Sequence, residues 1–171
     1  MQASSRSRLA LVPFVALMFT VLLSLSVHAE SNNTEASRGL QMSVYKTPTC
    51  GCCQKWVDYM AANGFTNKVI ELDNLNPLKT QKGIAGRYRS CHTGVITTTH
   101  GEYVFEGHVP AEYVKQFLDN PPAGAIGLSV PGMPIGSPGM EVGERKDYYQ
   151  VLLLNEDGTD TIFAHVNAPQ Q

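Results

Sequence analysis

The sequence is short of basic side chains. Lys and Arg together number 13 against 15 Asp and Glu, so the formal net charge is −2 with neutral histidines. Two of the basic residues, Arg6 and Arg8, fall in a predicted N-terminal leader, and without them the net charge is about −4. Proteins that bind nucleic acid or an anionic membrane surface rely on Lys and Arg. The shortage therefore argues against both as partners of the mature protein.

No cysteine lies near the end of the N-terminal apolar run, which argues against a lipid anchor there. The run covers residues 9–27, follows two arginines and ends at Val27-His28-Ala29, with small residues where a signal peptidase reads the chain. Its length approaches that of a membrane span, but Pro13 and the Val-x-Ala ending favour cleavage after about Ala29. We therefore expect a signal peptide, a periplasmic location and no membrane attachment after cleavage.

The rest of the chain has no repeat large enough to suggest an array, and its length suits one domain with a real core. Polar residues dominate its first part, which predicts a flexible arm. The predicted organisation is a signal peptide (1–29), a flexible arm (30–40), a thioredoxin-like metal-binding domain (41–123), and a Gly/Pro/Met loop with a C-terminal hairpin packed on the same domain (124–171).

Hydrophobic periodicity predicts an α/β fold. Cys53, Trp56, Val57 and Met60 have helical spacing, and Gly64 suits the end of that helix. Pro110 begins a later helix. Strands are predicted at residues 42–45, 65–72, 95–99 and 102–105, and a short helix at 77–82. The order strand, helix, strand, helix, hairpin, helix is that of a thioredoxin-like unit.

The segment 124–143 is rich in Gly and Pro and nearly free of charge, so we predict a loop without regular structure. It contains the same tripeptide twice, as Pro131-Gly132-Met133 and Pro138-Gly139-Met140. Residues 148–154 and 159–166 then read as two strands around a turn, which predicts a terminal hairpin.

Three of the four cysteines lie at the predicted junction between the first strand and the first helix. Such a turn presents backbone N–H groups and the positive end of the helix dipole, which stabilise thiolates. Cys50 and Cys53 form a C-x-x-C pair, Cys52 lies between them, and Cys91 is the fourth sulfur. Structural disulfides would pair Cys50–Cys53 with Cys52–Cys91, or Cys50–Cys52 with Cys53–Cys91.

Metal binding explains this crowding better than structural disulfides do. Three cysteines in one turn close only short loops, whereas converging thiolates bind a soft ion such as copper(I) or zinc. Zinc usually takes two pairs of ligands, and here only one pair stands beside the lone Cys91. The methionine-containing loop favours copper(I), because a thioether binds copper(I) and scarcely binds zinc.

Histidine and methionine offer further candidate ligands. His92 follows Cys91 directly, and His108 lies at a predicted strand-to-helix turn. Met133 and Met140 lie in the Gly/Pro loop, where periodic packing gives them no structural role. Met42, Met60 and Trp56 instead follow element patterns, so we predict that they pack in the core.

The motif blocks together resemble one family. They are Tyr45-x-Thr-Pro-Thr-Cys-Gly-Cys-Cys-x-x-Trp56, Ser90-Cys91-His92-Thr93, Glu106-Gly107-His108-Val109-Pro110, Val130-Pro131-Gly132-Met133-Pro134 and Gly136-Ser137-Pro138-Gly139-Met140-Glu141. In this order they resemble the CopG-like proteins, secreted bacterial metal-binding proteins associated with copper resistance. The resemblance implies a thioredoxin-like fold in the periplasm, copper(I) held by Cys50, Cys52, Cys53 and Cys91, and a role in copper redox chemistry. Because thiolates bridge copper(I) ions, we expect this compact set of cysteines to hold several ions per chain.

The sequence thus predicts a periplasmic copper(I)-binding protein whose partners are copper ions and other periplasmic copper-handling proteins. The alternative is a thiol–disulfide oxidoreductase in which Cys50 attacks and Cys53 resolves. That enzyme would depend little on Cys52, Cys91 or the methionines. A structural zinc module is a third reading.

Overall fold

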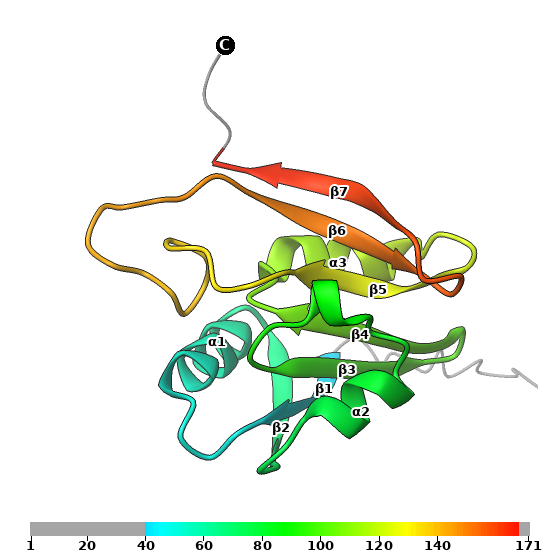
Figure 1. Ribbon diagram of the computed structural model, residues 1–171, viewed down its shortest axis with the longest axis horizontal. Coiled ribbons are helices and arrows are strands. Elements are labelled where there is room, and N and C mark those ends of the chain that lie inside the picture. Colours follow the sequence, from blue (N-terminus) through cyan, green and yellow to red (C-terminus); the bar gives the residue numbers. More distant parts are fainter. Residues whose placement is uncertain (1–39, 168–171) are drawn as a thin grey trace, which may run out of the picture. The chain divides into compact units, whose positions relative to one another are not determined.

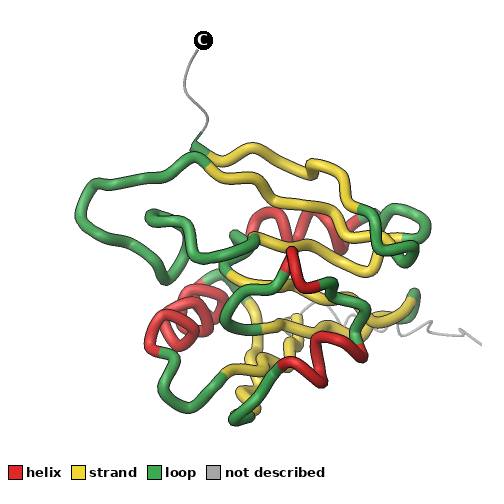
Figure 2. Tube along the Cα trace, in the orientation of Figure 1, coloured by secondary structure: helices red, strands yellow, loops and turns green. Residues whose placement is uncertain are grey.

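The computed structural model describes residues 40–167, and the predicted signal peptide and most of the predicted arm lie outside this range. The described part has a mixed α/β architecture (Figures 1 and 2). Its elements are β1 (Leu40–Lys46), α1 (Gly51–Ala62), β2 (Phe65–Glu71), α2 (Asn76–Gln81), a 3-10 turn (Gly86–Tyr88), β3 (Thr93–Thr98), β4 (Gly101–Gly107), α3 (Ala111–Asp119), β5 (Ala125–Val130), β6 (Tyr149–Asn155) and β7 (Asp160–Val166).

All seven strands belong to one sheet, in the order β2-β1-β3-β4-β5-β6-β7. The pairs β1–β2 and β4–β5 are parallel, and each is joined by a connection that contains a helix, as parallel neighbours require. The other neighbours are antiparallel. After α3 the chain returns to the sheet as β5, beside β4, and β6 and β7 extend the sheet on that side.

The sheet is covered on both faces. Tyr103 and Phe105 of β4 belong to the larger apolar cluster, which includes buried residues of α1 and α3, whereas the intervening Val104 belongs to a second cluster. That second cluster includes Ile84 and Tyr88 from the segment after α2. This alternation follows from the period of two along a strand, which directs successive side chains to opposite faces.

Helix α1 packs on the sheet through the stripe that the sequence predicts. Cys53, Trp56 and Met60 are fully buried, and the indole N–H of Trp56 donates to the carbonyl of Val109 at 2.9 Å. The helix starts directly after Cys50 and ends before Gly64, whose φ of +90° suits glycine. The cysteine motif is thereby fixed at the N-terminal end of a helix that is anchored in the core.

The predicted α/β class and the terminal hairpin of β6 and β7 are confirmed. The sheet, however, is larger than the predicted thioredoxin-like unit, and the prediction that residues 124–143 lack regular structure is wrong for Ala125–Val130, which form β5. The glycine at position 127 makes this strand resemble a loop in the sequence. A Cβ there would lie 1.8 Å from the carbonyl oxygen of Val104, so this strand needs glycine to approach β4.

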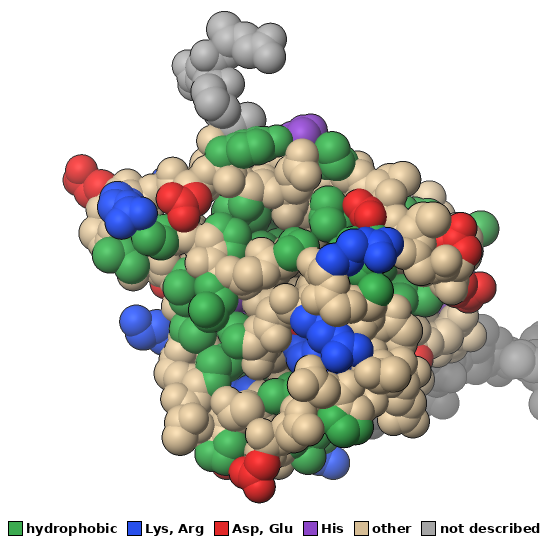
Figure 3. Space-filling model, in the orientation of Figure 1, with side chains coloured by type: hydrophobic (Ala, Val, Ile, Leu, Met, Phe, Trp, Pro, Cys, Tyr) green, Lys and Arg blue, Asp and Glu red, His purple; other side chains and the backbone are tan. Residues whose placement is uncertain are grey.

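No helix among residues 40–167 is long and apolar enough to cross a membrane. On the face shown in Figure 3, acidic and basic side chains are interspersed among uncharged atoms.

Candidate metal centre

The first half of the centre is the start of α1. Cys50 is the N-cap residue, Cys52 and Cys53 lie in the first turn, and no side chain caps the helix. Cys50 and Cys53 form a disulfide with a Cα–Cα distance of 5.3 Å, while Cys52 and Cys91 are free thiols. The structure thus contains the C-x-x-C disulfide of the first structural pairing, without its Cys52–Cys91 partner bond.

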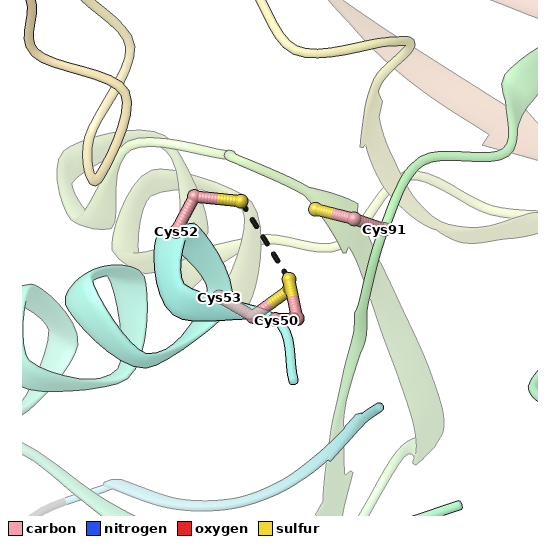
Figure 4. Close-up of side chains that lie close together, drawn as sticks. All are labelled: Cys50, Cys52, Cys53 and Cys91. Atoms are coloured by element: carbon pink, nitrogen blue, oxygen red, sulfur yellow. Dashed lines mark hydrogen bonds between the residues drawn. A yellow bond between two sulfur atoms is a disulfide. The ribbon is translucent and has the colours of Figure 1, made fainter. Parts of the chain in front are cut away.

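The second half is Cys91, which lies in the irregular segment just before β3. In Figure 4 its side chain points from this segment toward the start of α1, and the Cys52 side chain points toward it. The four cysteine sulfurs all lie within 4.8 Å of one another, and Cys50 and Cys52 are 3.6 Å apart. The fold therefore brings together all four cysteines that the sequence singles out.

Two imidazoles face the same sulfur. The Cys91 sulfur lies 3.3 Å from Nδ1 of His92 and 3.2 Å from Nε2 of His108. These three side chains form a second group whose candidate ligand atoms lie within 4.8 Å of one another. Cys91 therefore belongs to both groups, one made of sulfurs and one made of a sulfur and two imidazoles.

The tautomer of His108 is set by a neighbour. Its Nδ1 lies 2.8 Å from the carbonyl oxygen of Pro138, which can only accept, so Nδ1 carries the proton. The Nε2 lone pair then faces Cys91, which is the arrangement a metal-binding histidine needs. The His92 ring packs against that of Trp56 in a tilted arrangement, with a ring-centroid distance of 4.4 Å and an interplanar angle of 43°. Its Nε2 has no hydrogen-bond partner among the described residues.

Burial controls the charges at this site. Burial raises the pKa of the Cys91 thiol to about 12, and the neighbouring Cys52 adds to that shift. Burial also lowers the pKa of His108, and lowers that of His92 well below its ordinary value. At neutral pH Cys91 is therefore protonated and both imidazoles are uncharged.

The two Pro-Gly-Met copies occupy different environments. A Cβ on Gly139 would lie 2.8 Å from both the carbonyl oxygen of Cys52 and the amide nitrogen of Trp56, so the second copy lies directly against α1. Gly132 has no such neighbour within 4 Å. Met133 is 53% exposed, whereas Met140 is half-buried. Only the second copy is thus packed against the first turns of α1.

Sequence reasoning overlooked two buried charged residues beside the centre, Lys79 and Glu106. They form an ion pair and bind the backbone on the N-terminal side of Cys91. In the sequence, only the position of Glu106 inside one of the motif blocks indicates a role for it. Lys79 lies outside all of the blocks.

Comparison with known proteins places the chain in a family. Residues 88–140 match the family model described as "Protein of unknown function, DUF411". A solved structure of a copper resistance protein, CopG form 1, is 37% identical and has a TM-score of 0.69, and the match covers 76% of this chain and 99% of that one. The chain belongs to the CopG family.

A second CopG structure, form 2, gives the same result at 38% identity and a TM-score of 0.69, covering 75% of this chain and 98% of that one. No curated protein matches the chain. The predicted CopG resemblance is therefore confirmed. The relatives of this CopG family member are named for copper resistance, and the chain itself has a cysteine cluster that is able to hold a metal ion.

Proposed function

We propose that this protein is a periplasmic copper(I)-binding protein of copper resistance, and that its reduced form binds copper(I) through the four cysteines. The observation that carries the proposal is the convergence of their sulfurs within 4.8 Å, from two segments of the chain. Thiolates are soft ligands, and soft ligands select copper(I) over hard divalent ions. The relatives named for copper resistance support the same choice of metal.

The position of Cys91 supports more than one ion per chain. Its sulfur lies within 4.8 Å of the other three cysteine sulfurs and also of a ring nitrogen of both His92 and His108. A thiolate can bridge two copper(I) ions, so one ion would be bound mainly by sulfur and another by Cys91 with imidazole nitrogen. Met140, in the turn packed on α1, is the methionine placed better to complete a ligand shell, and Met133 is the more exposed of the two.

The disulfide gives the proposed binding a redox requirement. Two of the four sulfurs are joined in the Cys50–Cys53 bond and are not thiolate ligands in that state. Reduction by two external thiols, which become a disulfide in turn, would break this bond and supply two electrons and two protons, so that Cys50 and Cys53 become thiols. Copper(I) would then displace protons from the cysteines.

The binding claim is tested by titrating copper(I) against a competing chelator under anaerobic conditions. The fully reduced protein is expected to bind far more tightly than a variant with all four cysteines changed to serine. Cys50→Ser and Cys91→Ser should each weaken binding, and an excess of zinc should not displace the copper. Binding by the reduced protein no tighter than by the cysteine-free variant would refute the proposal.

A thiol–disulfide oxidoreductase is the second candidate, and the disulfide itself favours it. Cys50 is half-buried at the helix start while Cys53 is fully buried, which suits an attacking and a resolving cysteine. In an insulin-reduction assay, this function predicts activity that survives Cys52→Ser and Cys91→Ser but is lost in Cys50→Ser. A rate no higher than that of the Cys50→Ser variant would exclude it.

We also propose that β1 to α3 form a thioredoxin-like unit. The strand order β2-β1-β3-β4, with α1 after β1 and α3 after β4, supports this assignment. Within it, the cysteine motif occupies the turn between the first strand and the first helix. The expected partners are copper ions and other periplasmic copper-handling proteins.

A further inference from the structure

The pair formed by Lys79 of α2 and Glu106 of β4 is almost completely buried, with side-chain exposures of 4% and 0%. Removing two opposite charges from water costs several kcal/mol per ion, and the cost is offset only where their remaining hydrogen-bonding atoms are also satisfied. The groups that satisfy Lys79 and Glu106 therefore show what the pair holds in place.

Those groups flank Cys91 on both sides. Glu106 Oε1 accepts the backbone N–H of Ser90 at 2.6 Å, and its Oε2 accepts the hydroxyl of Thr93 at 2.6 Å. Lys79 Nζ donates to the carbonyl oxygen of Ser90 at 3.0 Å. The two charged side chains thus bind the residue before Cys91 and the residue after His92.

The backbone between these two anchors has few other hydrogen bonds. Residues 90–92 belong to no helix or strand, so no regular hydrogen-bond ladder fixes their backbone. Among the described residues, the Gly107 N–H donates to the His92 carbonyl at 3.0 Å, and the Ser90 hydroxyl donates to the Gly132 carbonyl. Since irregular backbone moves easily without such bonds, the position of the Cys91 sulfur depends on them.

We propose that Lys79 and Glu106 are positioning residues of the candidate metal centre. They hold residues 90–93 so that the Cys91 sulfur stays within reach of the α1 cysteines and of both imidazoles. Their effect on copper(I) rests on the proposed function, whereas their effect on the place of Cys91 does not.

The chain offers a matched control pair. Lys82 and Glu102 also form an ion pair, three residues further along the chain from Lys79 and four before Glu106. Their pair is partly exposed, at 19% and 43%, and links the C-terminal end of α2 to the beginning of β4. Among the described residues, neither side chain of this pair forms a hydrogen bond to residues 90–93. Neutralising the pair therefore changes the contact between the same two elements without altering the bonds of the Cys91 segment.

Two double variants remove the charges of the buried pair without leaving one ion unpaired. K79M/E106L loses the three hydrogen bonds that the two charged side chains make to Ser90 and Thr93. In K79M/E106Q the amide can still accept from Ser90 and donate to Thr93, so this variant is the conservative rescue. K82M/E102Q is the control, and circular dichroism and thermal unfolding show which variants are folded.

Two readouts are taken on the reduced protein. The first uses no metal: iodoacetamide is added, and the alkylation rates of Cys91 and Cys52 are compared by peptide mass spectrometry. We expect Cys91 of K79M/E106L to react about tenfold faster, because the segment opens more easily, while Cys52 keeps its rate. K79M/E106Q and K82M/E102Q should react like the unmodified protein.

The second readout is copper(I) affinity by chelator competition. We expect a 10–100-fold loss in K79M/E106L, the size usual for residues that orient a metal ligand, and a far smaller loss in the other two variants. If the unmodified protein binds no copper(I), the proposed function fails while the alkylation rates still decide the positioning claim.

The positioning claim is overturned if folded K79M/E106L alkylates Cys91 at the rate of the K82M/E102Q control. If K79M/E106L does not fold, Thr93→Val replaces it, because this change breaks only the contact to Glu106 Oε2. Cys91 must then react faster than in the control, and an equal rate overturns the claim.

Discussion

At the scale of single residues, the centre depends most on Cys91. It is the only residue that belongs to both candidate ligand groups of the described chain. Its neighbours His92 and His108 present nitrogen atoms within 3.3 Å, and its burial keeps the thiol protonated at neutral pH. A metal ion that binds here has to displace a proton from a thiol that holds it strongly.

This displacement predicts a pH dependence of copper(I) binding. Because the pKa of Cys91 is raised to about 12, this thiol gives up one proton when it becomes a copper ligand, at any pH in the neutral range. Cys91 alone should therefore strengthen binding about tenfold per pH unit as the pH rises. Affinities measured by chelator competition at several pH values should show a steeper slope for the unmodified protein than for Cys91→Ser. Equal slopes would mean that Cys91 is not a ligand.

Much of this residue-level account could be predicted from sequence, because cysteine is rare and its spacing is informative. The crowding of Cys50, Cys52 and Cys53 needs no structure to be noticed. The roles of Lys79 and Glu106 could not be predicted, since 27 residues separate them and their contacts exist only after α2, β4 and the Cys91 segment assemble. A lone Lys or Glu is ordinarily exposed, so nothing local marks either residue as buried.

At the scale of elements, the second Pro-Gly-Met copy packs against α1. Gly139 has a φ of +86° and lies against the backbone of Cys52 and Trp56, and the carbonyl of the preceding Pro138 orients His108. The first copy ends in the exposed Met133. Identical tripeptides therefore have different roles, which depend on where the chain places them.

This difference predicts unequal effects of the same substitution. Gly132→Ala adds only backbone strain, since φ is +72° and no atom lies within 4 Å, and should lower the free energy of unfolding by about 1–3 kcal/mol. Gly139→Ala adds a close contact with α1 to similar strain, so we expect a larger loss of stability and weaker copper(I) binding. Denaturant unfolding of both variants measures the difference. Equal losses would show that the turn does not press on α1.

The same reasoning explains the element that sequence analysis missed. Residues 125–130 resemble a loop because glycine interrupts them, yet Gly127 is required where β5 approaches Val104. Strand and helix patterns elsewhere were predicted well, because the stripe of α1 and the terminal hairpin follow from local periodicity. Close approach between two backbones depends on the tertiary structure, which the periodicity of a sequence does not reveal.

At the scale of the whole molecule, the sheet joins the predicted thioredoxin-like unit to the C-terminal part. Strand β5 pairs with β4 in parallel, and β6 and β7 continue the sheet beyond it. Leu128 and Val130 of β5 and Val151 of β6 are fully buried in the same cluster as the core of α1 and α3. Both parts of the chain therefore contribute to the core that supports the candidate metal centre.

A truncation tests whether the two parts of the chain share one core. A chain of residues 40–123 would expose the β4 edge and uncover the apolar surface that β5 and β6 bury. We expect it to lack the cooperative thermal unfolding of residues 40–171, as measured by circular dichroism, and to aggregate more readily. A truncated chain that unfolds cooperatively at the same temperature would show that the C-terminal strands are an independent addition.

The most direct test of the central claim is the number of copper ions per chain, counted by native mass spectrometry on protein loaded with copper(I) under anaerobic conditions. The account predicts more than one copper ion on the reduced protein, fewer on Cys91→Ser, and a loss of bound copper when the Cys50–Cys53 disulfide is kept oxidised. Reduced protein that carries no copper, or a count that is the same with and without the four cysteines, would contradict it.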